Sequence, residues 1–181
     1  MKNDTSNHIA GSLVPIIGEF KAVIHRAQPD GTYVIEDRPW KRNVLTAPGL
    51  NRIANRAIQA TGTTPAWVLG VGTITAAASL DSVNFGDVVG GRKSGMTNPA
   101  SSGLVACQSR EWFFLNATWA GNADSLTGIA LDSAAILDST TSGSGIVFNI
   151  VNALGVTLQA SDFLNLTARI RVGSHNSAHS A

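Results

Sequence analysis

The clearest pattern in the chain is an alternation of apolar and polar residues near its C-terminal end. One side of the segment 163–172 would carry Leu164, Leu166, Ala168, Ile170 and Val172, and the other Phe163, Asn165, Thr167, Arg169 and Arg171. This period of two is typical of a strand with one face in the core and one in water. The segment 110–120 alternates in the same way, with Trp112, Phe114, Asn116 and Thr118 opposite Phe113, Leu115, Ala117 and Trp119. We therefore expect two half-buried strands.

Three further apolar segments are short and bounded by turn residues. They are "AWVLGVGT" (66–73), "LTGIALD" (126–132) and "GIVFNIVNAL" (145–154). Glycine- and serine-rich connections such as "STTSGSG" separate the later ones. Several short strands with such turns predict a mainly β fold, an antiparallel, jelly-roll-like β-sandwich.

A hairpin is expected before these strands. The segments "GEFKAVIHRA" and "TYVIEDRPWKRNVLT" flank Pro29-Asp30-Gly31, in which Pro presets φ, Asp caps the turn and Gly accepts a positive φ. The pattern predicts an N-terminal β-hairpin over Glu19–Thr46.

One helix is predicted, at about 48–60. Pro48 suits a first helical turn, and Gly62 ends the pattern. Arg52 and Arg56 stack on the polar face, where they would meet solvent, a carboxylate or a partner. The apolar face, expected to dock on a sheet, consists of Leu50, Ile53, Ala54, Ala57 and Ile58. The full arrangement is a flexible arm at 1–12, one β-sandwich domain with this packed helix at 13–173, and a polar tail at 174–181.

The glycine-rich segment "VNFGDVVGGRKSG" (83–95) suggests a phosphate-binding loop, but the match fails. Arg92 stands where the motif needs Lys, and Lys93 displaces the hydroxyl residue. Gly95 and Pro99 also oppose the helix that should follow. We interpret the segment as a mobile loop that orders against a neighbour, and Gly70–Thr73 as a strand end where backbones approach closely.

Charge is scarce and unevenly placed. Charged residues make up 14% of the chain, against roughly 25% in an average soluble domain, which favours a surface buried in an assembly. The formal net charge is +1, so nucleic acid is not an expected partner. The candidates for contacts between subunits are the basic Arg38, Lys41, Arg42, Arg52 and Arg56 and the acidic Asp124, Asp132 and Asp138.

No motif predicts catalysis, a cofactor or a metal site. The single cysteine, Cys107, lies in "LVACQ" and is expected to be a buried strand residue. His175 and His179 are four apart but lie in a Ser- and Asn-rich tail, where a solvated tail is the simpler reading. No segment resembles a signal peptide or a membrane span, so we expect a protein made in a cytoplasm.

Two alternatives to a purely structural role stay open. Exposed tryptophans could form a platform for glycan, although Trp40, Trp67, Trp112 and Trp119 are more simply explained as core residues. A glycan hydrolase would need two carboxylates in one cleft, and Asp124 with Asp132 or Asp138 is the one candidate cluster.

The order of segments from Asn43 to Val172 resembles a family of small virion structural proteins of tailed bacteriophages. The resemblance rests on "NVLTAPGLNRIANRAI", "LGVGT", "SLTGIALDSAAILDST" and "GVTLQASDFLNLTARIRV". It implies a β-sandwich building block of a tail, a fibre attachment, a collar or a capsid decoration. Such a protein would work in the virion as a homo-oligomer, in contact with other virion proteins and without catalytic residues. This chain departs from the family pattern because it adds the hairpin Glu19–Thr46 before the shared segments and polar arms at both ends.

Overall fold

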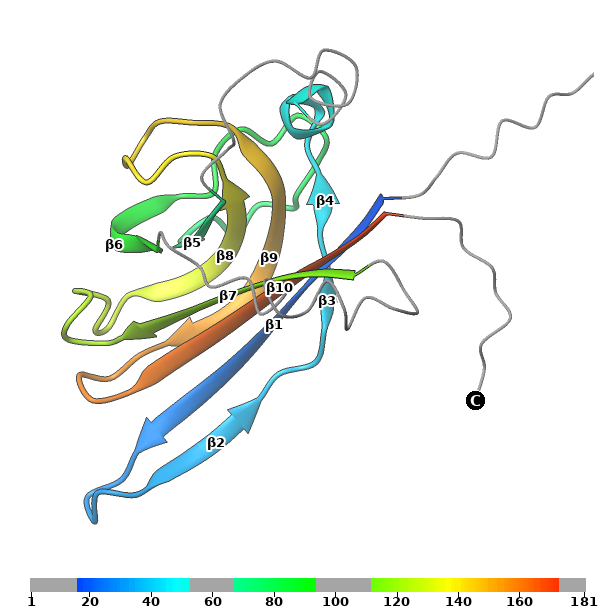
Figure 1. Cartoon of the computed structure of the whole chain (residues 1–181). Helices are drawn as coiled ribbons and strands as arrows, with labels where there is room; N and C mark the ends of the chain where they lie inside the picture. Colours follow the sequence, from blue (N-terminus) through cyan, green and yellow to red (C-terminus); the bar gives the residue numbers. More distant parts are fainter. Residues whose placement is uncertain (1–15, 53–66, 94–111, 173–181) are drawn as a thin grey trace, which may run out of the picture.

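Two five-stranded antiparallel sheets pack face to face in the computed structural model, which describes residues 16–52, 67–93 and 112–172 (Figure 1). Sheet A has the order β2-β1-β10-β7, and β3 also pairs with β1. Its strands are β1 (Ile16–Ala27), β2 (Tyr33–Asp37), β3 (Lys41–Arg42), β7 (Trp112–Ala120) and β10 (Phe163–Val172). Sheet B has the order β4-β9-β8-β5-β6. Its strands are β4 (Val44–Leu45), β5 (Val68–Gly72), β6 (Asp87–Lys93), β8 (Ala130–Leu137) and β9 (Val147–Thr157). The predicted antiparallel β-sandwich is confirmed.

The main core lies between the sheets and uses the alternation seen in the sequence. On β10, Leu164, Leu166 and Ala168 are buried, while Phe163 is exposed. On β7, Leu115 and Trp119 enter the same core. On β1 the corresponding residues are Phe20, Ala22 and Ile24. Full burial of one such aliphatic or aromatic side chain contributes about 1.5–3 kcal/mol, so these rows dominate the stability of the sandwich.

The central part of sheet B is buried on both faces. All five residues of β5 are buried, as are the last five of β8. A second cluster made by Val68, Phe85, Ala135, Leu137, Val147 and Ile150 lies apart from the main core. Because neighbouring strand residues point to opposite faces, Val68 and Leu69 of β5 enter different clusters. This explains why the β5 segment is nearly continuously apolar.

The expected hairpin is present, but its second strand is shorter than predicted. In the turn, Gly31 has φ +82°, and Asp30 Oδ1 accepts a hydrogen bond from Thr32 N at 2.9 Å. β2 ends at Asp37, and Pro39, which has no N–H to donate, follows two residues later. The chain then pairs with β1 again as β3 and crosses to sheet B as β4. β1 lies between β2 and β10, so it belongs to the core of the fold and is not an addition outside it.

The helix begins at residue 47 and is described to residue 52. Thr46 caps it: its Oγ1 accepts a hydrogen bond from Gly49 N at 3.1 Å and donates to Val147 O of β9. Leu50, which we expected on the docked face, is 37% exposed. Leu50 lies in the first turn of the helix, and the other residues expected on that face follow it in the sequence. Residues 53–60 lie outside the described residues, as do Cys107, the arms 1–12 and 174–181, and the two tail histidines.

The prediction of a mobile loop at 83–95 was wrong for its central part. Asp87–Lys93 forms β6, which pairs with β5. The glycines serve close packing: Gly90 has φ +74°, and a Cβ on it would collide with the backbone of Asp124. A glycine-rich sequence thus forms a strand where a neighbouring backbone leaves no room for side chains. The expected close approach at Gly70–Thr73 is confirmed, because a Cβ on Gly72 would meet Phe85 O.

Candidate interaction face

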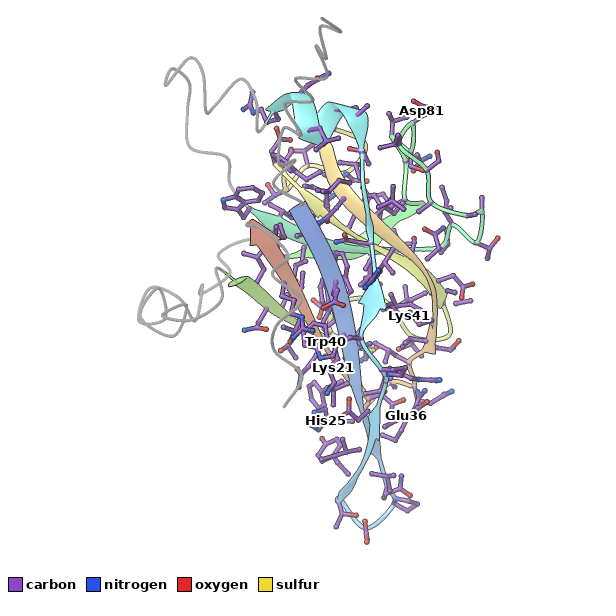
Figure 2. All side chains as sticks on the ribbon, turned by 90° about the vertical axis from the view of Figure 1, so that its right-hand side faces the viewer. Lys21, His25, Glu36, Trp40, Lys41 and Asp81 are labelled. Atoms are coloured by element: carbon purple, nitrogen blue, oxygen red, sulfur yellow. The ribbon has the colours of Figure 1, made fainter. Side chains whose placement is uncertain are left out.

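The outer face of sheet A carries the side chains that the core does not use. Four of them come from β1 (Glu19, Lys21, Val23, His25) and four from β10 (Phe163, Asn165, Thr167, Arg169). Figure 2 shows Lys21, His25 and Trp40 on one side of the β1 ribbon, and Lys41 and Glu36 on the other. The registers place these residues in rows that cross the sheet, such as Ile35–His25–Phe163. The face is therefore a surface on which the side chains of neighbouring strands stand in a definite order.

An aromatic depression lies at the end of this face near the β1–β2 turn. It measures about 200 Å³ and is lined by His25, Tyr33, Thr118, Phe163 and Asn165. The ring centroids of Tyr33 and Phe163 lie 5.7 Å apart, and those of His25 and Tyr33 6.4 Å apart. Thr118 Oγ1 donates to Asn165 Oδ1 at 2.7 Å, which leaves Asn165 Nδ2 to donate to His25 Nε2 at 3.0 Å. The imidazole of His25 is thus held by one hydrogen bond and by the ring of Tyr33, which itself packs on Phe163.

The edge strand β2 borders this depression and is unusually apolar for an exposed strand. Tyr33, Val34 and Ile35 are 47%, 55% and 62% exposed. Within the described ranges, β2 pairs on one side only, with β1. In Figure 1 it runs along the margin of sheet A, away from β5, β6 and β8. Natural edge strands are generally protected from pairing by charge, proline or bulges. The exposed apolar residues at 33–35 therefore favour pairing of this edge with a partner.

Trp40 and Arg169 form a second feature, at the other end of the face. Arg169 Cζ lies 4.0 Å from the Trp40 ring centroid, and Arg169 Nε donates to Glu19 Oε2 at 2.7 Å. Trp40 is only partly buried, so it is not the core residue that we expected. Trp119 is a core residue, and Trp67 packs against that core beside Phe148. The side chain of Trp112 lies outside the described residues.

The basic candidates for subunit contacts lie in different places. Arg38 forms an ion pair with Glu36, and Lys41 donates to Ala153 O. Arg42 is exposed on β3. Arg52 Nη2 lies 4.0 Å from Oδ2 of Asp138, which is an acidic candidate of the same chain. Arg56 lies outside the described residues.

The acidic candidates are mostly engaged within the chain. Asp124 forms an ion pair with Lys93 and accepts a hydrogen bond from Ala120 N at 2.8 Å. Asp138 accepts one from Ile146 N at 2.6 Å. Asp132 is half-buried near the start of β8, and Asp138 follows the end of the same strand. In the carboxylate pair of Asp124 and Asp138, which the sequence offered for a glycan hydrolase, both members are thus engaged by groups of their own chain.

A polar network that the sequence did not suggest closes the end of the sandwich near the β9–β10 turn. Asp162 is buried and accepts hydrogen bonds from Ala27 N at 3.0 Å, Gln159 N at 2.9 Å and Arg26 Nη1 at 2.9 Å. Burial raises the pKa of Asp162, but these hydrogen bonds and the Arg26 charge outweigh it and hold that pKa below its ordinary value. Arg26 also pairs with Glu36, so this network ties β2 to the β9–β10 turn. In the sequence, Asp162 is one aspartate among several in turns.

A second polar network joins β6 to the turn at 139–144. Arg92 donates to Asp87 Oδ2 at 3.0 Å, to Ser139 O at 2.7 Å and to Ser144 O at 2.9 Å. The pKa of Asp87 is lowered: burial alone would raise it, but hydrogen bonds from Ser142, Arg92 and Gly143 N prevail. A depression of about 260 Å³ adjoins this pair. Because Arg92 binds two carbonyls of the 139–144 turn, its function in this fold is to hold that turn against β6.

No protein-family model, curated protein or solved structure matches the chain. None of the helical segments in the described ranges combines the length and the apolar character needed to cross a membrane. Among the residues that the structure describes, no three His, Cys, Asp or Glu side chains are grouped to hold a metal ion.

Proposed function

We propose that this protein is a structural subunit of a tailed-bacteriophage virion. It would assemble as a homo-oligomer on the tail, collar or capsid surface and connect or stabilise particle components. The sequence resemblance over Asn43–Val172 and the scarcity of charge support this role. The observation that carries the assembly part is the exposed apolar edge of β2, which pairs with β1 on one side and, among the described residues, with no strand on the other.

Solution mass tests the assembly part directly. Light scattering of the purified full chain, from about 1 µM to about 1 mM, covers the usual range of modest protein affinities. We expect a discrete oligomer whose population rises with concentration. A monomer throughout that range would contradict a homo-oligomeric subunit. Mass spectrometry of phage particles from the host that encodes the chain would test the virion location, and absence from those particles would reject it.

The aromatic depression favours a second candidate function, a module that binds host glycan. Tyr33 and Phe163 offer ring faces, and Thr118 and His25 offer polar atoms beside them. Aromatic faces with nearby polar groups suit the apolar faces and hydroxyls of sugars. This site differs from the tryptophan platform suggested by the sequence.

Binding of host surface polysaccharide, measured by calorimetry, tests this second candidate. Tyr33→Ala and Phe163→Ala should each weaken binding at least tenfold. Val89→Ala, a change at a more exposed apolar residue on sheet B, should leave it unchanged. Equal binding by all three variants and the original chain would reject the depression as a glycan site.

A further inference from the structure

The backbone of β2 has one side bonded to β1, and its other side pairs with no strand among the described residues. Arg38 N donates to Ala22 O at 3.0 Å, and Gln28 N donates to Thr32 O at 2.9 Å. Both bonds follow the β1–β2 register, in which Val34 lies opposite Arg26. In an antiparallel pair, hydrogen-bonded residues alternate with non-bonded ones. The N–H and C=O groups of the even-numbered residues therefore point to β1.

It follows that three odd-numbered residues direct their backbone groups away from the sheet. They are Tyr33, Ile35 and Asp37, and they span β2 from end to end. Ile35 is the midpoint of the strand and one of its most exposed residues. The open edge is thus symmetric about Ile35 in its hydrogen-bonding groups.

We infer that β2 pairs antiparallel with β2 of a second copy, about a two-fold axis through Ile35. The two Ile35 residues would face each other, and each Tyr33 would lie opposite Asp37 of the other copy. Each hydrogen-bonded pair of residues exchanges two bonds, so this register forms about six backbone hydrogen bonds. The two sheets A would join into one continuous sheet across the axis. This inference rests on the proposed homo-oligomeric role and specifies its contact.

The side chains of β2 favour a second copy in this register. Val34 would lie opposite Glu36, and Thr32 opposite Arg38, so no like charges face each other directly. An axis at Glu36 would set two Glu36 carboxylates against each other and bring Pro39 opposite Tyr33. An axis at Val34 would bring Gly31, a turn residue with positive φ, opposite Asp37. Of these three axes, only the one at Ile35 pairs every residue of β2 with a β2 residue of the second copy.

Cross-linking tests the register. In a background with Cys107→Ser, Ile35→Cys would place two thiols on facing residues about 5.5 Å apart between Cα atoms, within disulfide reach. We expect mild oxidation to capture a covalent dimer in Ile35→Cys. Val34→Cys should yield little dimer, and Val89→Cys, at a still more exposed position on β6, should yield none. Equal capture at Val34 and Ile35, or none at Ile35, would overturn the register.

Backbone pairing is tested separately with Ile35→Pro. Its N–H points away from β1, so proline removes no hydrogen bond within the chain but deletes the central donor of the pair. We expect at least a tenfold weaker dimer with the circular dichroism spectrum preserved. If the original chain forms an oligomer that Ile35→Pro and Ile35→Lys both retain, this inference fails and the proposed function survives. If the original chain is monomeric at every concentration, both fail together.

Discussion

Sheets A and B have the same number of strands but opposite relations to solvent. The central part of sheet B, formed by β5, most of β8 and the first half of β9, is covered on both faces, by the main core on one side and by Phe85 and its neighbours on the other. Sheet A has one buried face and one open face, and its edge strand β2 is open as well. The difference shows where function can reside, because residues of sheet B are mostly constrained by packing. The outer rows of sheet A, in contrast, present their side chains to a partner.

The largest expected effect is the loss of the Trp119 side chain from the core between the sheets. Trp119 is fully buried, so Trp119→Ala should cost about 3–5 kcal/mol in the free energy of unfolding. Trp40→Ala removes a tryptophan from the open face and should cost under about 1 kcal/mol, mainly its contact with Arg169. Urea denaturation measures both. Equal costs would contradict the division between a packed face and an open one.

Asp162 should give the next largest effect, with a defined pH dependence. Asp162→Asn removes the charge that faces Arg26 in a buried site and should cost about 2–4 kcal/mol at neutral pH. The pKa of Asp162 is lowered by folding, so its contribution is complete above the ordinary pKa of about 3.8. That contribution is lost as the pH falls through the lower pKa of the folded state.

Unfolding free energies measured from pH 6 to pH 2 would check the sign. The original chain should lose stability on acidification, and Asp162→Asn should lose less. Some acid sensitivity should persist in the variant, because folding also lowers the pKa of Asp87. Parallel curves for the two proteins would show that Asp162 does not contribute to the pH dependence.

Two threonines offer a matched comparison of smaller size. Thr46 is buried, caps the helix and bonds to β9, so Thr46→Ala should cost about 1–2 kcal/mol. Thr118 is exposed and makes one side-chain bond on the open face, so Thr118→Ala should cost under about 0.5 kcal/mol. Thermal unfolding at matched pH measures both. A Thr118→Ala variant as unstable as Thr46→Ala would mean that the open face supports the fold.

The smallest expected effect on stability is at β2 itself. Ile35→Lys exchanges an exposed apolar side chain for a charged one and should change the free energy of unfolding of the monomer by under about 0.5 kcal/mol. Chemical denaturation at low micromolar concentration checks this. A loss of several kcal/mol would show that Ile35 packs within its own chain.

The sequence predicted those parts of the fold that follow from local periodicity. The alternation of β10 and β7 located the core between the sheets, and Pro29-Asp30-Gly31 located the turn of the β1–β2 hairpin. The nearly continuous apolar segment at β5 also predicted a strand, although the cover on its second face comes from distant Phe85 and Leu137.

Features that depend on distant backbone were not predictable. Glycine density in β6 indicated a loop, because nothing local shows that Asp124 lies against Gly90. The partners of Asp162 and Arg92 come from other strands and turns, so composition placed these residues only among scattered charges. Alternation likewise cannot show which strand lies at an edge, and the open apolar edge of β2 emerged only from the sheet order.

Residue-resolved hydrogen exchange by NMR tests the central claim, that the open edge of sheet A is where the chain assembles. The Val34 and Glu36 amides bond to β1 and should be protected at every protein concentration. The amides of Tyr33, Ile35 and Asp37 point outward, so they should exchange fast in dilute solution and become protected as concentration rises. Exchange at these three amides that stays fast while the chain oligomerises would contradict the account.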